Sequence, residues 1–173
     1  MIFMISKEEA VQILKDEGCA EKIIQHCLTV ADEAVRLAKK NKAAGRKVDI
    51  GLVEIGAILH DLGRAETHGM DHAVVGVRLA KKHNVEKPIL EIIKKHIGAG
   101  ITPEEADFFG LPDDDYIPRT LEEKIVAHAD NMVKGTKIIT LKRRNEILKE
   151  NGADKDIRKR INKLAHEVAP DEI

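Results

Sequence analysis

Apolar residues recur along most of this chain at spacings of three and four positions, which is the period of an amphipathic helix rather than of a strand. Capping residues, glycines and prolines divide the pattern into segments. The predicted helices lie at about residues 6–18, 21–40, 49–61, 71–80, 88–97, 102–110, 120–133, 138–148 and 157–168. We therefore predict an all-α fold, a compact single-domain bundle of about seven to nine helices with no significant sheet.

The segment from Asp49 to Asp61 differs from the others because it is apolar on most of its faces. Such a helix is expected at the centre of a domain. It ends in a His-Asp pair at His60, and Gly63 suits the cap that follows a helix C-terminus. Asp71 suits the N-cap of the next helix. The Pro- and Asp-rich loop from Leu111 to Arg119 is the one candidate for a lid or a boundary.

Two polar side chains at the end of an apolar run are costly to bury unless something binds them. Histidine and aspartate are good ligands for divalent first-row cations. Further residues of both types lie on or beside the apolar sides of other predicted helices. The candidate metal ligands are His26, His60, Asp61, His72, His96 and Asp130. Six ligands exceed one tetrahedral site, which favours two metals bridged by Asp61, whereas with His72 and His96 as core residues the site would hold one.

The order of these ligands resembles the HD superfamily of metal-dependent phosphohydrolases, with His26 first, His60-Asp61 next and Asp130 last. The run His60-Asp61-Leu62-Gly63 resembles the HDIG-type variant of the superfamily motif. The resemblance covers about residues 20–135. It implies a compact helical fold in which His26, His60, Asp61 and Asp130 bind one metal.

His72 and His96 look like the additional histidines of superfamily members that bind two metals. The runs from His72 to Gly76 and from Glu123 to Asp130 are similar to bacterial HD-type dinucleoside tetraphosphate hydrolases. The chain also resembles archaeal HDIG-domain proteins of unassigned substrate. It departs from these relatives at Arg64, where they often have lysine, and it lacks the Gly-Tyr-Pro motif of the cyclic-dinucleotide phosphodiesterases.

The resemblance divides the chain into three parts. Residues 1–19 are expected to form an N-terminal helix packed on the domain, residues 20–135 the HD domain, and residues 136–173 basic helices packed on the same domain. From Lys134 to Lys163 there are 11 Lys and Arg against 4 Asp and Glu, although the whole chain has a formal net charge of −1. This segment could attract phosphates, but a solvated helical face is its plainer interpretation.

The resemblance implies a divalent-metal-dependent phosphohydrolase that cleaves a phosphoester or phosphoanhydride of a nucleotide, dinucleoside polyphosphates included, by attack of a metal-bound hydroxide. Asp61 would bridge the metals and orient this nucleophile. Arg64 is a candidate catalytic and phosphate-binding residue, although a surface arginine fits equally well. His68 could protonate the leaving group or support a ligand, and Lys134 is a candidate substrate-binding residue. Mixed His and carboxylate ligation favours one or two ions of Mn, Fe, Zn or Ni over Mg.

The alternative function is a metal-containing binding or regulatory module that holds nucleic acid or a protein partner through its basic C-terminal helices, without catalysis. The absence of Trp and the presence of a single Tyr argue against a broad stacking surface for single-stranded nucleic acid. We expect Phe108 and Phe109 to fill the core rather than to stack on a base. We expect His128, two residues before Asp130 on a helix, to point away from the metal ligands.

Cys19 and Cys27 form no CxxC motif, and we expect them to be the reduced thiols of a cytoplasmic protein. No stretch reaches transmembrane length, and the apolar start at residues 1–5 runs directly into charged residues, unlike a signal peptide. The expected partner is a small phosphorylated substrate rather than a membrane, with a homodimer as an open alternative to a monomer.

Overall fold

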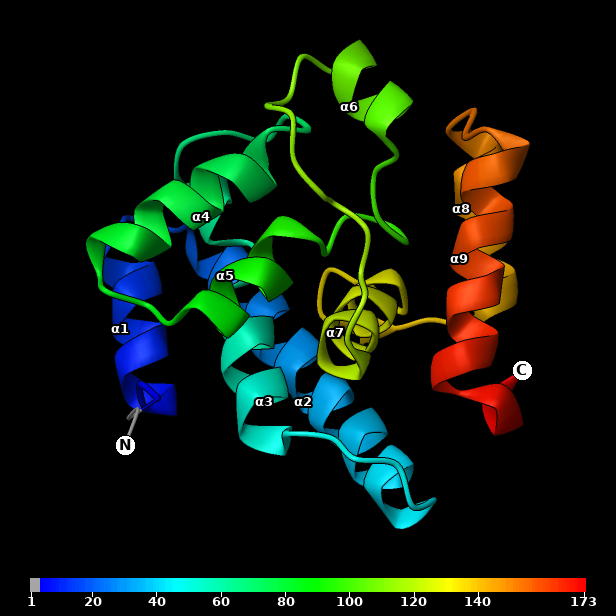
Figure 1. The fold of residues 1–173 in the computed structure, drawn as a ribbon, viewed down its shortest axis with the longest axis horizontal. Helices are drawn as coiled ribbons and strands as arrows, with labels where there is room; N and C mark the ends of the chain where they lie inside the picture. The colour runs from blue at the N-terminus through cyan, green and yellow to red at the C-terminus, as the bar shows by residue number, and fades with distance from the viewer. Residues whose placement is uncertain (1–3) are drawn as a thin grey trace.

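Helix α3 (Ile50–Leu59) is packed among other helices in the computed structural model, which describes residues 4–173 (Figure 1). The other helices are α1 (Lys7–Asp16), α2 (Glu21–Ala43), α4 (His72–Lys82), α5 (Lys87–Lys94), α6 (Pro103–Phe108), α7 (Leu121–Asn131), α8 (Leu141–Glu150) and α9 (Lys155–Val168). Two short 3-10 turns are η1 (Leu62–Ala65) and η2 (Pro170–Glu172). The all-α prediction is confirmed, while the expectation for the apolar start falls partly on residues 1–3, outside the described residues.

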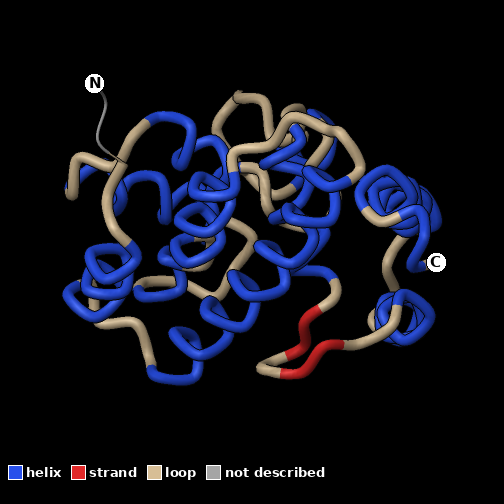
Figure 2. Tube along the Cα trace, turned by 90° about the horizontal axis from the view of Figure 1, so that it is seen from below, coloured by secondary structure: helices blue, strands red, loops and turns tan. Residues whose placement is uncertain are grey.

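A small hairpin interrupts the helical pattern between α7 and α8. Strand β1 (Val133–Lys134) pairs in antiparallel fashion with β2 (Lys137–Ile138), which Figure 2 shows as the red segments. Gly135 in the connecting turn has a φ of 62°, a value that suits glycine. The prediction of no significant sheet holds, but the helical pattern alone did not indicate these strands.

The helix starts follow local capping chemistry. The side chains of Ser6, Thr102 and Thr120 each accept a hydrogen bond from the amide three residues later, and a glutamate at that position returns one. Asp71 occupies the predicted N-cap position of α4, but its side chain makes no capping hydrogen bond there. Its backbone is already helical, and its carboxylate accepts a hydrogen bond from the Thr67 hydroxyl at 2.9 Å instead.

The apolar core is built on α3, which packs against α1, α2, α5 and α7. Val53 and every residue from Ile55 to Leu59 are buried. Each fully buried Leu or Ile side chain stabilises the fold by about 1.5–3 kcal/mol. The same apolar cluster extends to Leu14 of α1 and to Leu164 of α9, so both ends of the chain pack on it. The division of the chain into three parts, with boundaries after residues 19 and 135, remains a prediction.

The expectation that Phe108 and Phe109 fill the core is wrong. Phe108 is 83% exposed and Phe109 is 41% exposed. Both lie at the end of α6, a helix of six residues that stands apart from the main core in Figure 1. The buried residues nearby, Ile101, Ala106 and Tyr116, form a separate small cluster to which neither phenylalanine belongs. Within residues 4–173, no helix is both long and apolar enough to cross a membrane.

His128 is a core residue on the side of α7 away from Asp130. It is only 3% exposed, and it lies near Glu33 and Arg36 of α2. Burial lowers its pKa to about 4, although the charges of Glu33 and Glu172 act in the opposite direction. The folded protein therefore favours the neutral form of His128.

The pH dependence of the free energy of unfolding should reveal that His128 is buried in its neutral form. An unfolded His128 titrates near pH 6.5, so its stabilising contribution is complete above that pH and is lost as the pH falls toward 4. In urea unfolding with excess chelator, lowering the pH from 7 to 4.5 should cost the wild type about 2–3 kcal/mol more than His128→Gln. Equal losses in the two proteins would contradict a buried, neutral His128.

Candidate metal centre

Five helices bring the six predicted ligands to one place. His26 lies on α2, His72 in the first turn of α4, and His96 just after α5. Asp130 lies near the end of α7. The His-Asp pair was predicted to occupy the last turn of α3, but His60 caps that helix and Asp61 already belongs to the turn into η1.

The carboxylate of Asp61 lies between two groups of imidazoles. Its Oδ2 atom is 3.6 Å from Nε2 of His26 and 3.5 Å from Nε2 of His60. Its Oδ1 atom is 3.4 Å from Nε2 of His72 and 3.3 Å from Nε2 of His96. Asp130 joins the first group, with Oδ1 at 3.0 Å from His26 and 3.2 Å from His60. The ligands therefore form two lobes that share Asp61.

Each imidazole is held by a backbone carbonyl on its far side. The Nδ1 atoms of the four rings lie 2.6–2.8 Å from carbonyl oxygens; the pairs are His26 with Gly135, His60 with Ala57, His72 with Gly69, and His96 with Ile93. A carbonyl only accepts, so Nδ1 carries the proton in each ring. In the neutral ring the lone pair of Nε2 then faces the cluster, which is the orientation that metal-binding histidines require.

The donor set fits metal ions. Nε2 of His60 and Oδ1 of Asp61 are buried and have no hydrogen-bond partner within the described chain. Nε2 of His72 and Nε2 of His96 lie 3.0 Å apart, and with both protons on Nδ1 two acceptors face each other. Buried acceptors without donors are destabilising, whereas a cation satisfies them together. The donor atoms of His26, His60 and Asp130, and those of His60, Asp61 and His96, lie within 4.8 Å of one another.

Mutual pKa shifts keep the carboxylates charged. Burial opposes the charging of His60, but Asp61 and Asp130 outweigh it and hold the pKa of His60 above its ordinary value. Burial also opposes ionisation of the two aspartates, yet the imidazoles, His60 foremost, keep the pKa of each carboxyl well below its usual range. Burial lowers the pKa of His96, and the charges of other histidines add to this. A metal would displace the proton of His60, so rising pH favours its uptake.

The cluster opens on one side only. The side chains of His26 and Asp130 are 15% and 22% exposed, whereas those of the other ligands are closed off. Arg64 lies at the cluster, with Nε at 3.2 Å from Oδ2 of Asp61. His68 is exposed, and in the described part of the chain it makes no hydrogen bond or ion pair. Lys134 is exposed on β1, next to the glycine that holds His26.

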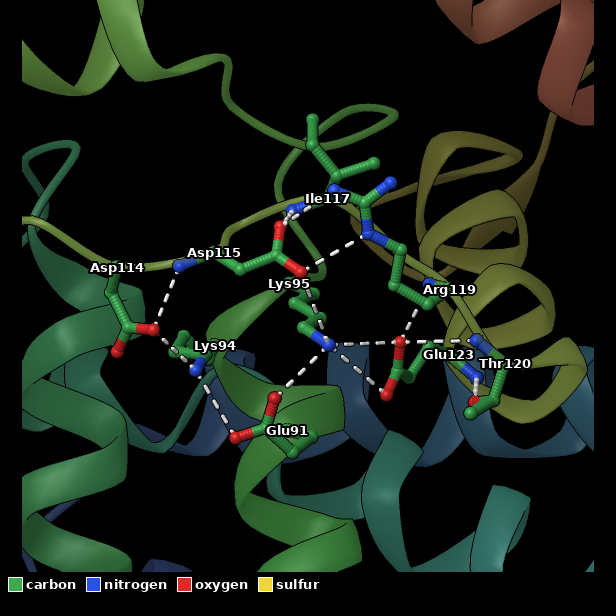
Figure 3. A network of polar contacts seen from close by, with 9 residues as sticks. All are labelled: Glu91, Lys94, Lys95, Asp114, Asp115, Ile117, Arg119, Thr120 and Glu123. Atoms are coloured by element: carbon green, nitrogen blue, oxygen red, sulfur yellow. Dashed lines mark hydrogen bonds and ion pairs between the residues drawn. The ribbon is translucent and has the colours of Figure 1, made fainter.

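Sequence patterns did not indicate the ion-pair network beside the cluster (Figure 3). Lys95 is buried, with Nζ at 3.3 Å from Oε2 of Glu123 and 3.0 Å from Oε2 of Glu91. Glu123 also accepts the amide of Arg119 at 2.7 Å, and Lys94 pairs with Asp114 at 2.9 Å. The network fastens the loop from 111 to 119, the candidate lid, to the helices next to His96 and Asp130. A pair 28 residues apart leaves no periodic signal in the sequence.

Gly63 has a different role from the predicted helix cap. A Cβ atom at Gly63 would lie 1.8 Å from the carbonyl oxygen of His72 and 2.7 Å from the amide nitrogen of Gly76. The missing side chain therefore lets η1 touch the first turn of α4. This contact sets the distance between Asp61 and His72.

Substitution of Gly63 should separate these two segments. Gly63→Ala should lower the free energy of unfolding by about 2–3 kcal/mol because backbone atoms cannot move aside easily. Urea unfolding measures the loss. The matched control is Gly51→Ala in the first turn of α3, where the new methyl meets no backbone atom but only two side chains, the flexible end of Met4 at 3.0 Å and Oδ1 of Asp49 at 3.5 Å. If the two variants are equally stable, the close contact between Gly63 and α4 does not require a glycine.

Several proteins of known sequence are similar to this chain. An uncharacterized protein of Methanocaldococcus jannaschii is 48% identical over 134 residues, which cover 78% of this chain and 79% of that protein. A tRNA (cytidine(56)-2'-O)-methyltransferase of Picrophilus torridus is 42% identical over 96% of this chain. One of Thermoplasma volcanium is 40% identical over 91%. The chain spans 47% and 45% of these two methyltransferases, about half of their length.

Two solved structures share the fold. The HD domain of the L. monocytogenes phosphodiesterase PgpH superposes with a TM-score of 0.54 at 18% identity, covering 90% of this chain and 94% of that one. Its complex with cyclic-di-AMP gives 0.55 at 17% identity, covering 95% and 99%. The HD domain family itself matches residues 23–134, a stretch that includes all six clustered His and Asp residues. This chain belongs to the HD domain family.

Proposed function

We propose that this protein is a divalent-metal-dependent phosphohydrolase that cleaves a phosphoester or phosphoanhydride bond of a nucleotide, dinucleoside polyphosphates included. The observation that carries the proposal is the convergence of four imidazole Nε2 atoms on the two oxygens of Asp61. All four rings are oriented by backbone carbonyls, so the cluster is prepared for ligation before any ion binds. Membership of the HD domain family supports the same interpretation.

The ligands divide between two ions in this proposal. His26, His60 and Asp130 would hold one ion, His72 and His96 would hold the other, and Asp61 would contribute to both sites. When bound, the ions supply a water of lowered pKa and neutralise charge on the phosphoryl group. The mixture of imidazoles and carboxylates favours Mn, Fe, Zn or Ni over Mg.

The remaining predicted residues act on the substrate. Arg64 lies at the cluster and is partly exposed, so its guanidinium can turn to two phosphate oxygens. Lys134 lies beside the open edge of the cluster. His68 stays a proposed proton donor, supported only by its place between η1 and α4.

Two further features support a nucleotide substrate and an intracellular site of action. A solved HD domain of the same fold was crystallised with cyclic-di-AMP, which is a property of that protein. Cys19 and Cys27 are free thiols, which agrees with a reducing, cytoplasmic environment as part of the proposal.

Metal content should distinguish the two lobes. Purified wild-type protein should contain two ions per chain by elemental analysis and hydrolyse bis(p-nitrophenyl) phosphate or members of a nucleotide panel. Asp61→Asn should lose both ions and reduce the hydrolytic rate roughly 1,000-fold, because it removes the shared ligand. His96→Ala should retain one ion.

The control for this experiment is Asp71→Asn, which changes an exposed carboxylate near the cluster. It should keep the metal and the activity of the wild type. Full metal content in Asp61→Asn would overturn the ligand assignment. Two ions without hydrolysis of any substrate would overturn the phosphohydrolase.

The second candidate function is an RNA-binding module. A match to the Picrophilus torridus methyltransferase over 96% of the chain must include most of residues 136–173, which lie beyond the HD match at 23–134. Helices α8 and α9 carry exposed lysines that form no ion pair in the described structure; they are Lys142, Lys149, Lys155, Lys159 and Lys163. Their charges could contact an RNA backbone.

Salt dependence would test this second function. If α9 binds tRNA, the triple variant Lys155→Gln, Lys159→Gln, Lys163→Gln should bind more weakly, and its plot of log K against log salt should be shallower by about two to three. The matched triple variant is Lys39→Gln, Lys42→Gln, Lys47→Gln on and after α2, which should bind as the wild type does. Equal slopes in all three proteins would exclude α9 as an RNA contact.

A further inference from the structure

The hairpin formed by β1 and β2 has a geometry that places two lysines side by side. Its two-residue loop, Gly135-Thr136, has a positive φ at the first position, as in type II′ turns. The register pairs Lys134 directly with Lys137. Residues directly opposite each other in an antiparallel pair project from the same face. Both ammonium groups therefore belong to one face of the hairpin.

The hairpin is fastened to the candidate metal centre from two sides. The carbonyl of Gly135 accepts a hydrogen bond from Nδ1 of His26 at 2.7 Å. From α8, Arg144 donates to the carbonyl of Asn131 at the end of α7 and to that of Val133 in β1. Strand β1 also packs on α2 and α7. The turn is thus held at the open edge of the cluster, beside its partly exposed ligands.

The two lysines have no counter-ion in this arrangement. Like charges directly opposite each other on paired strands are destabilising. Both side chains are exposed, and neither pairs with a carboxylate within residues 4–173. The nearest acidic residue along the chain, Asp130, is already committed to His26 and His60. An anion held between the lysines would relieve their repulsion.

We propose that the hairpin is a phosphate-binding flap in which Lys134 and Lys137 hold a second, non-scissile phosphate of the substrate. This inference rests on the proposed function. The scissile phosphate belongs at the cluster, where Arg64 pairs with Asp61. The lysines flank Gly135, whose carbonyl holds His26, and in this proposal they meet the next phosphate along the substrate. Ammonium groups suit this role because they act as point charges on phosphate. The favoured substrates therefore carry at least two linked phosphates.

Binding of two related nucleotides would test the flap. In calorimetric titrations of the metal-loaded protein, adenosine 5′-(α,β-methylene)diphosphate should bind roughly tenfold more tightly than AMP. The variant Lys134→Gln, Lys137→Gln should lose this preference, with the two affinities converging. The charge-preserving variant Lys134→Arg, Lys137→Arg should keep it, which shows that the hairpin still folds.

The matched control is Lys42→Gln, Lys47→Gln, which removes one exposed charge in the last turn of α2 and one just after that helix, and it should keep the wild-type preference. If the wild type does not prefer the diphosphate, or if the glutamine variant keeps the preference, the flap is overturned. Hydrolysis of bis(p-nitrophenyl) phosphate by the wild type reports separately on the proposed function. An active enzyme without the preference rejects only the flap, whereas a metal-loaded protein that hydrolyses neither this ester nor any member of the nucleotide panel rejects the phosphohydrolase.

Discussion

The interaction on which the rest of the structure depends is the contact of one buried carboxylate, Asp61, with four imidazoles. Three of the rings are fixed in the same local manner, since His60, His72 and His96 each direct Nδ1 to the carbonyl three residues earlier. The carbonyls of Ala57 and Ile93 lie in the last turns of α3 and α5, where carbonyls lack the regular helical hydrogen bond and can accept one from a side chain. The helix ends therefore supply the acceptors that orient the ligands, and where a helix stops decides where its histidine points.

Close packing between segments brings these helix ends within reach of Asp61. Helix α3 is buried because it is apolar nearly all round, and this places His60 deep in the domain. Gly63 removes the side chain that would separate η1 from α4, and Gly76 does the same on the opposite surface. The ion pairs of Lys95 with Glu123 and Glu91 then hold α5 against α7. A buried ion pair contributes little net stability, so its value here is the fixed position of two helices.

The part of the chain beyond the HD match completes the site. The match ends at residue 134, one residue before the glycine whose carbonyl orients His26. Arg144 of α8 satisfies carbonyls at the end of α7, next to Asp130, and in β1. The C-terminal helices thus support the open edge of the cluster mechanically, whatever else their charges bind.

The sequence by itself determined the helices, most of their caps and which His and Asp residues cluster around Asp61. Periodicity and capping act within four or five residues, so they can be recognised from local order alone. The tertiary structure decided what depends on the distance between segments. The division of the ligands into two lobes, the partner of Lys95 and the close contact at Gly63 all join residues far apart in the chain. The tertiary structure also decided that Phe108 is exposed and that a hairpin forms at Gly135. The type of a residue, apolar or turn-forming, does not specify which other segment it will contact.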